Sequence, residues 1–406
     1  MRVALYHPWI YVKSGLERTI LEIARRSRHD WELFTSHYDA EGTYPELRQF
    51  NVRETGKVSV RRSYGAVLGA SARVAMTRLD LDDADALLVC CDGVGSLITL
   101  RNARRPVVNL CFTPLRAVYD PEYRRRHLAR RRPIARALAL ALEAGYRVVD
   151  KVLWRRYRRV VCISQAVRER VDAGGLGSAA PTVVLYPGID EASIHASDRF
   201  EPFFFLPGRI MWTKNLELGI EAFHRFRAAG HGEYRLVIAG MVDAKSAAYF
   251  ERLRGLAEPG GAIDFHIDPT DVQMQDYYRR CTAVLFTAFN EDLGLTPMEA
   301  MACGKPVVAV DRGGPREVVE AGVTGYLAEP DPAAFSEAML RLARDAPLAR
   351  SMGRAGLERV RRFTWDRFVE GLDEVIDQVV AENGRRKAAG SRQGAGGGTR
   401  EAGESS

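Results

Sequence analysis

The sequence predicts an α/β protein with two domains, each a parallel sheet covered by helices. The chain has 406 residues, which exceeds what one hydrophobic core ordinarily organises. Hydrophobic residues make up 46% and charged residues 27%, a balance typical of a globular protein. Short apolar runs alternate with helical stretches from end to end, and this alternation indicates parallel strands joined by helices.

In the first half, apolar runs predict strands and amphipathic stretches predict helices. The helix at 14–26 places Leu16, Ile20, Ile23 and Ala24 on one face, and the helix at 165–175 ends in glycines. The expected strands are 2–6, 86–90, 106–112, 158–164 and 183–190.

The pattern restarts after residue 187, so we expect one domain at 1–187 and a second at 188–364. The residues from 384 to 406 are rich in Gly, Ser and charge, and they predict a disordered tail. Strands are expected at 203–210, 234–240, 263–267, 283–288 and 306–310, with helices at 215–230, 246–257, 272–281 and 296–303.

Composition and motifs exclude several classes of protein. No apolar run is long enough to span a membrane, and the N-terminus lacks the pattern of a signal peptide. The six cysteines sit mostly in apolar runs without zinc-ligand spacing, so we expect reduced core residues in a cytoplasmic protein. The chain has no P-loop, no G-x-G-x-x-G after a strand, no HExxH, no nucleophile elbow and no strand-flanking Asp-x-Asp pair.

The stretch "FNEDLGLTPMEAMACGK" places two acids beside a predicted helix start. Thr296 as N-cap, Pro297 at the first helical position and Glu299 three residues after the cap form an expected capping box. Capping does not explain Glu291 or Gly294. An acid and a glycine above a helix N-terminus are typical of a site for a polar ligand, in which free amides bind an anion and carboxylates bind hydroxyls.

Two cations follow the preceding strand. In "LPGRIMWTKN", Arg209 and Lys214 leave the strand through a glycine turn. Arg and Lys are ordinarily solvated surface residues, and that is the alternative for both. We nevertheless expect them at the carboxyl edge of the same sheet as Glu291. There they are suited to neutralise a diphosphate.

Together these segments resemble the retaining GT-B glycosyltransferases of family 4, whose fold is two Rossmann-like domains facing a cleft. Glu291 to Glu299 matches that family's E-x7-E motif, and "GRIMWTKN" matches its phosphate motif. The resemblance is strong from about residue 203 to 366 and looser before it. It also implies that a final helix at 365–383 crosses back to the first domain.

The resemblance implies a role for each matched residue. Arg209 and Lys214 bind the donor diphosphate, Glu299 holds the ribose and Glu291 contacts the transferred sugar. Gly294, Leu295 and Thr296 present backbone amides to the donor. Gly15, in "KSGLER", is expected close to phosphate and acceptor, although Ser14 and Glu17 also form a capping box that explains this turn.

One segment departs from its relatives. "CFTPLRAVYDP" resembles a segment of mannosyltransferases that build bacterial polysaccharides and lipid-linked glycans, with Phe112 in place of His and Tyr119 in place of Trp. A phenyl ring neither hydrogen-bonds a sugar hydroxyl nor carries a proton. If the segments correspond, the acceptor or donor sugar differs or activity is reduced. Because Thr113, Pro114 and Arg116 keep their places, we expect this loop to face the cleft, and a structural turn is the alternative.

The expected function is therefore transfer of a sugar, with retention and without a metal or other cofactor, from a nucleotide diphosphate sugar to a hydroxyl acceptor. GDP-mannose is the first expected donor and a UDP-sugar the next, and the product belongs to cell-surface polysaccharide or glycolipid assembly. Glu291 as covalent nucleophile ranks below an orienting role. The alternatives are a catalytically silent GT-B protein that binds a nucleotide sugar or partner enzyme, and a nucleotide-sugar epimerase, for which the cleft lacks a convincing acid–base pair.

Thirteen basic residues lie between Arg124 and Arg159, against only Glu143 and Asp150. A solvated charged face is one interpretation. Nucleic-acid binding is not expected, since few aromatics are interspersed and no known module is present. Contact with an anionic membrane surface is the third interpretation and the one we favour; it would make the protein peripheral on the inner face of the cell membrane, near a lipid-linked acceptor.

Overall fold

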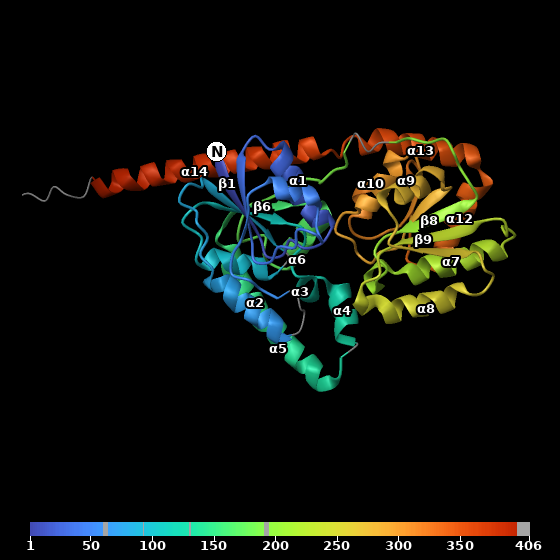
Figure 1. Cartoon of the computed structure of the whole chain (residues 1–406), viewed down its shortest axis with the longest axis horizontal. Coiled ribbons are helices and arrows are strands. Elements are labelled where there is room, and N and C mark those ends of the chain that lie inside the picture. The colour runs from blue at the N-terminus through green and yellow to red at the C-terminus, as the bar shows by residue number, and fades with distance from the viewer. Residues whose placement is uncertain (60–63, 92, 130, 191–194, 396–406) are drawn as a thin grey trace, which may run out of the picture. The chain divides into compact units, whose positions relative to one another are not determined.

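The computed structural model describes residues 1–59, 64–91, 93–129, 131–190 and 195–395. It divides into two compact units, each with its own sheet (Figure 1). Unit 1 comprises residues 1–162, 168–185 and 369–406, and unit 2 comprises residues 163–167 and 186–368. The α/β fold predicted from the alternating pattern is confirmed, because both sheets are parallel throughout.

The sheet of unit 1 has seven strands in the order β3-β2-β1-β4-β5-β6-β7. Its strands are β1 (Arg2–His7), β2 (Asp30–Thr35), β3 (Val52–Glu54), β4 (Ala86–Cys91), β5 (Val107–Cys111), β6 (Tyr157–Cys162) and β7 (Thr182–Val184). The connections are α1 (Gly15–Arg26), η1 (Pro45–Gln49), α2 (Tyr64–Met76), η2 (Val94–Leu100), α3 (Arg116–Tyr119), α4 (Pro121–Ala129), α5 (Pro133–Trp154) and α6 (Gln165–Ala173), where η denotes a 3-10 helix.

The sheet of unit 2 has six strands in the order β10-β9-β8-β11-β12-β13. The strands are β8 (Phe203–Pro207), β9 (Arg235–Gly240), β10 (Ile263–Ile267), β11 (Ala283–Phe286), β12 (Val307–Val310) and β13 (Gly325–Ala328). The helices are η4 (Trp212–Lys214), α7 (Leu216–Ala228), η5 (Ala244–Ser246), α8 (Ala247–Ala257), α9 (Asp271–Arg280), α10 (Leu295–Ala302), α11 (Pro315–Val318), α12 (Pro332–Arg344), α13 (Ala346–Val360) and α14 (Trp365–Ala395).

The strand order of unit 2 reverses between β8 and β11. From β8 the chain proceeds outward through β9 and β10, then returns to pair β11 with the other side of β8, with Ala283 opposite Phe204. In open parallel sheets, ligands bind beyond the carboxyl ends of the strands at such a reversal. The two loops that carry Lys214 and Glu291 leave β8 and β11, so the topology brings them to this point.

The cores are the apolar runs that predicted the strands. Phe204 and Phe226 are fully buried in unit 2, and their rings meet edge to face with centroids 5.1 Å apart. Five of the six cysteines are unpaired and buried, as expected for reduced core residues, and the side chain of Cys91 lies outside the described part. Within the described residues, no helix combines the length and hydrophobicity needed to cross a bilayer.

The C-terminal helix is longer than expected. Helix α14 runs from Trp365 to Ala395, so residues 384–395 are helical and the expectation of a disordered tail from 384 is wrong for them. Their Arg, Lys and Ala residues are good helix formers, and adding them to an existing helix requires no new nucleation. Residues 396–406 lie outside the described part. From residue 369 onward the described helix groups with unit 1.

Candidate active site

The loop after β8 carries Lys214 at the end of η4. Hydrogen bonds from two residues that follow β11 fix its backbone: Thr287 Oγ1 donates to the Lys214 carbonyl at 2.7 Å, and the Phe289 amide donates to the Thr213 carbonyl at 2.9 Å. The next residue, Asn215, adopts a positive φ of 52° before α7 begins. The sheet thus positions the lysine through its main chain.

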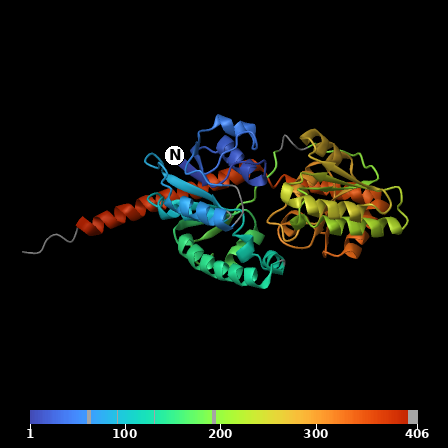
Figure 2. The same ribbon diagram turned by 60° about the horizontal axis from the view of Figure 1, so that its bottom comes forward.

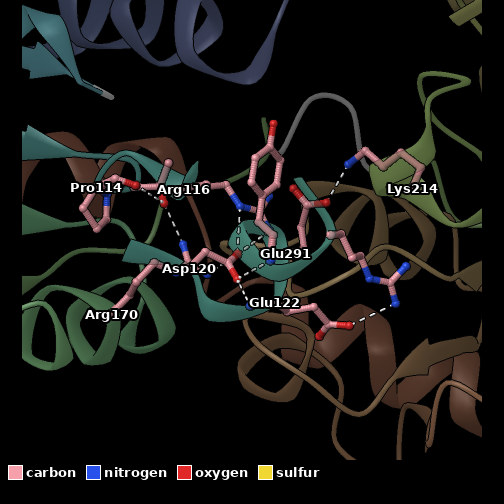
Figure 3. A network of polar contacts seen from close by, with 10 residues as sticks. Pro114, Arg116, Asp120, Glu122, Arg170, Lys214 and Glu291 are labelled. Atoms are coloured by element: carbon pink, nitrogen blue, oxygen red, sulfur yellow. Dashed lines mark hydrogen bonds and ion pairs between the residues drawn. The ribbon is translucent and has the colours of Figure 1, made fainter. Parts of the chain in front are cut away.

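Lys214 and Glu291 form an ion pair across the sheet reversal. The distance from Lys214 Nζ to Glu291 Oε2 is 2.6 Å, and both side chains remain 22% exposed (Figure 3). The ammonium group also lies 5.7 Å from the centre of the Phe286 ring. Since an ammonium has three donors, this lysine is able to hold Glu291 and a ligand oxygen at once.

Arg209 lies earlier in the same loop and is exposed. Within the described residues, its side chain has no hydrogen bond or ion pair, so the guanidinium fork is available for an anion. Gly208 precedes it with a φ of 137°, and the loop lies so close to β9 that a Cβ on Gly240 would come within 2.0 Å of the Gly208 carbonyl oxygen. Gly240 is a supporting residue that the sequence analysis did not identify.

Helix α10 begins two residues earlier than expected, which corrects the predicted capping box. Gly294, with a φ of 104°, is the N-cap, and no side chain caps the helix. Thr296 and Pro297 therefore lie inside the first turn. A positive φ is accessible to glycine at little cost, which explains the position of the cap. The amides of Leu295 and Thr296 are left at an N-terminus that attracts anions.

Glu299 is held by a neighbouring helix instead of capping its own. Tyr278, buried on α9, donates a hydrogen bond of 2.6 Å from its hydroxyl to Glu299 Oε2. Desolvation by the surrounding protein raises the pKa of Glu299, and the Tyr278 hydrogen bond and the charge of Lys214 oppose this rise. The side chain nevertheless remains exposed to solvent, where a ligand reaches it. Tyr278 was missed because no local pattern links it to Glu299.

The loop after β12 supports the loop that carries Glu291. The Gly314 amide donates to the Glu291 carbonyl at 2.8 Å. A Cβ on Gly314 would lie 2.3 Å from Leu293 Cα, and one on Gly313 would lie 2.6 Å from the Glu291 carbonyl oxygen. The consecutive glycines in "DRGGP" were the available signal for this close approach.

Gly15 belongs to unit 1, where it is the first residue of α1. Ser14 is the N-cap and accepts from the Leu16 amide at 3.3 Å, while its hydroxyl donates to the Glu17 carboxylate. In a full capping box the carboxylate accepts from the backbone amide of the N-cap residue, whereas Glu17 accepts from the Ser14 hydroxyl. The structure therefore accounts for this turn by capping, and a role for Gly15 toward a ligand stays a prediction.

The "TPLR" segment of unit 1 is an internally bonded turn. Arg116 donates to the buried Asp120 at 3.1 Å from Nε and 3.0 Å from Nη2, and Arg170 donates to Thr113 Oγ1 at 2.6 Å (Figure 3). Asp120 also accepts the amides of Glu122 and Tyr123. Of the two interpretations of this segment, these bonds support the structural turn.

Residues 190–359 match the family described as "Glycosyl transferases group 1". Over 93% of this chain and 96% of the human protein, the sequence is 28% identical to alpha-1,3/1,6-mannosyltransferase ALG2 of Homo sapiens. It is also 28% identical to the lipopolysaccharide core biosynthesis mannosyltransferase LpcC of Rhizobium leguminosarum bv. viciae, over 64% of this chain and 75% of that protein.

Solved structures agree in fold. The Anabaena protein Alr3699/HepE, solved in complex with UDP and glucose, superposes with a TM-score of 0.70 at 20% identity, covering 94% of this chain and 100% of that one. Sucrose-phosphate synthase from Thermosynechococcus elongatus superposes with a TM-score of 0.73 at 18% identity and the same coverage. With its two parallel α/β units the chain has the GT-B fold of these solved structures, and its residues 190–359 are similar to the glycosyl transferases of group 1.

Proposed function

We propose that this protein transfers a mannosyl group from GDP-mannose to a hydroxyl of a lipid-linked or polysaccharide acceptor, with retention at the anomeric carbon. The observation that carries the proposal is the ion pair of Lys214 and Glu291 at the reversal of the unit 2 sheet. The exposed Arg209 lies in the same loop as Lys214. Cations and a carboxylate together suit a ligand that combines a diphosphate with sugar hydroxyls.

The cations stabilise the leaving group. As the bond from the anomeric carbon to the phosphate oxygen breaks, negative charge grows on the diphosphate. Lys214, Arg209 and the amino end of α10 are the groups suited to stabilise that charge. Loss of one preorganised donor of this kind raises the activation barrier by about 2.7–4 kcal/mol. The side-chain cations supply the neutralisation, so the proposal uses no metal ion.

Retention follows from attack on the face that the leaving group vacates. The acceptor oxygen bonds to the anomeric carbon, and its proton passes to the departing phosphate oxygen. Glu291, held by Lys214, orients the transferred sugar through its hydroxyls. Glu299, held by Tyr278, binds the ribose hydroxyls. A covalent role for Glu291 ranks lower, because a carboxylate engaged by an ammonium is a weaker nucleophile.

The relatives rank the donors. Two relatives named as mannosyltransferases favour mannose, and the UDP in the HepE complex makes a UDP-sugar the next candidate. Acceptors of lipid-linked or lipopolysaccharide type suit a protein located in the cytoplasm at the inner face of the membrane.

A thermal-shift panel of nucleotide sugars, measured on the full chain, distinguishes these candidate donors. A ligand at a hundred times its dissociation constant adds about 2.7 kcal/mol of stability, so the true donor stands out. GDP-mannose is expected to give the largest shift. A larger shift with a UDP-sugar rejects the mannose donor, and no shift with any nucleotide sugar rejects the donor site.

A catalytically silent nucleotide-sugar protein is the second candidate. It is favoured by Phe112 at the position of a histidine and by the engagement of Arg116 with Asp120. Such a protein binds donor in the thermal-shift panel without consuming it. Release of free nucleotide diphosphate from the bound donor, with or without acceptor, excludes it.

A further inference from the structure

Helix α5 of unit 1 turns apolar side chains toward solvent along most of its 22 residues. Ile134 is 87% exposed, Val148 67% and Leu138 57%. At 3.6 residues per turn these positions share one side of the helix, and that side also carries Leu142, Val149 and Val152. Exposed apolar patches of this extent mark surfaces that something covers.

The opposite side of α5, which faces the protein, carries the acids. Glu143 is buried and accepts a 2.6 Å hydrogen bond from Arg124 Nε. Asp150 is also buried, and its burial raises its pKa to about 6. A helix that packs on its own core ordinarily buries its apolar residues and exposes its charges. Ala139, Leu153 and Trp154 are also buried on α5, but the exposed apolar residues named above are not, so the core does not account for the outer side.

Exposed basic residues stand at both ends of the helix. Arg132 and Arg136 are exposed at its amino end, and Lys151, Arg155 and Arg156 at its carboxyl end. Both acids of α5 are the buried ones described above, so the exposed charged residues of the helix are all cations. Arg130, in the same basic segment, lies outside the described residues.

Helix α2 also exposes apolar side chains. It packs against η2, as α5 does, and both pictures show the two helices side by side in unit 1 (Figures 1 and 2). Leu68 is 61% exposed and Met76 66% exposed on α2, where Arg73 is also exposed. A second helix beside α5 therefore also presents apolar side chains and a cation to solvent.

We infer that this surface of α5 and α2 binds an anionic lipid membrane, with α5 lying in the plane of the interface. A broad apolar side bordered by Lys and Arg is the pattern of helices that rest at the boundary of headgroups and acyl chains, where cations reach up to the phosphates. The border also decides against a second copy of this chain. Pairing two α5 helices would bring cations of one copy against cations of the other, and the apolar side is wider than a coiled-coil seam.

A basic cavity at the carboxyl end of α5 fits the same ligand. Its volume is about 370 Å³, and its lining includes Arg104, Arg105, Arg156, Arg158 and Arg386. Arginine forks bind phosphate through two hydrogen bonds, which suits a lipid headgroup. The end of the helix thus offers a place for the phosphate of a lipid.

Sedimentation of the full chain with vesicles tests the inference without requiring transferase activity. The protein is expected to sediment with vesicles of phosphatidylcholine and phosphatidylglycerol and to remain in solution with phosphatidylcholine alone, because each nearby Lys or Arg adds attraction to anionic lipid. The double variant Ile134→Ser/Val148→Ser is expected to lower the partition coefficient at least about tenfold, since two buried apolar side chains are lost. The charge variant Arg132→Gln/Arg155→Gln is expected to lose the preference for anionic vesicles.

A matched control removes an apolar side chain elsewhere. Val272 on α9 of unit 2 is 78% exposed, and Val272→Ser is expected to sediment as wild type does. Unchanged circular dichroism of the double variant keeps unfolding from imitating the effect. Failure of wild type to sediment with anionic vesicles overturns the inference, as does unchanged sedimentation of the double variant. A wild-type dimer that the double variant abolishes shows instead that the surface joins two copies. The thermal-shift panel with nucleotide sugars, which reports on unit 2, stays independent of each outcome.

Discussion

Tyr278 on α9 donates a 2.6 Å hydrogen bond to Glu299 on α10, and this bond orients a carboxylate that is expected to grip ribose. The tyrosine is buried and the carboxylate is exposed, so a group in the interior holds a group at the surface. A hydrogen bond from a neutral donor to a carboxylate favours the ionised form and lowers its pKa.

Replacing Tyr278 by Phe is expected to raise the pKa of Glu299 further. The hydrogen bond that lowers this pKa is removed, while the desolvation that raises it stays. Donor binding that needs the ionised carboxylate then weakens first at low pH. The dissociation constant of the donor, measured from pH 5 to pH 8, should show its acid limb moved to higher pH in the variant. An acid limb at the same pH in both proteins would show that the ionisation of Glu299 does not control donor binding.

Replacing Lys214 by Ala is expected to reduce turnover about a hundredfold or more, because one donor to the leaving diphosphate is lost. The transfer rate at saturating donor is the measurement. Lys245, an exposed lysine of η5 in the same unit, provides the control, and Lys245→Ala should keep the wild-type rate. A Lys214→Ala rate within a few-fold of wild type rejects the proposed role.

Replacing Gly240 by Ala is expected to lower the free energy of unfolding of unit 2 by about 2 kcal/mol, since the new Cβ would overlap the Gly208 carbonyl oxygen. The displaced loop carries Arg209, so donor affinity should fall with stability. Gly255 on α8 provides the opposite case, because its Cβ would meet open space. Gly255→Ala should raise stability by about 0.5–1 kcal/mol without changing donor affinity. Equal effects at both glycines would contradict the close approach of the two loops.

Lys305 is fully buried, and its ammonium donates to the carbonyls of Ser197 and Arg199 beside the Phe200 ring. Burial lowers its pKa from 10.5 to about 8. Between these values the unfolded chain binds the extra proton, so stability should rise with pH across pH 8 to 10.5, by up to roughly 3 kcal/mol.

Comparison with Lys305→Met isolates this contribution. The unfolding free energies of the two proteins, measured by denaturant at pH 7, 8, 9 and 10, should show wild type gaining stability relative to the variant as the pH rises. Parallel curves would mean that Lys305 keeps an ordinary pKa in the fold.

Several of the site's features could be predicted because they depend on residues close in sequence. The strands β8, β9, β11 and β12 were recognisable as apolar runs, and the glycines at 208 and 294 stood where the chain turns. The short spacing from Glu291 to Glu299 fixed a loop followed by a helix. The start of that helix was misplaced because Thr296 is a good cap by type, whereas Gly294 supplies the positive φ that the turn requires.

The sequence by itself determined the alternation of strands and helices, the two units and the residue types gathered at the site, since periodicity and turn chemistry act between near neighbours. Tertiary structure alone decided that Lys214 meets Glu291, that Tyr278 holds Glu299 and that α5 turns its acids inward and its apolar side outward. Strand order and helix packing bring together residues separated by tens of positions, and no local pattern of side chains specifies which of them will touch.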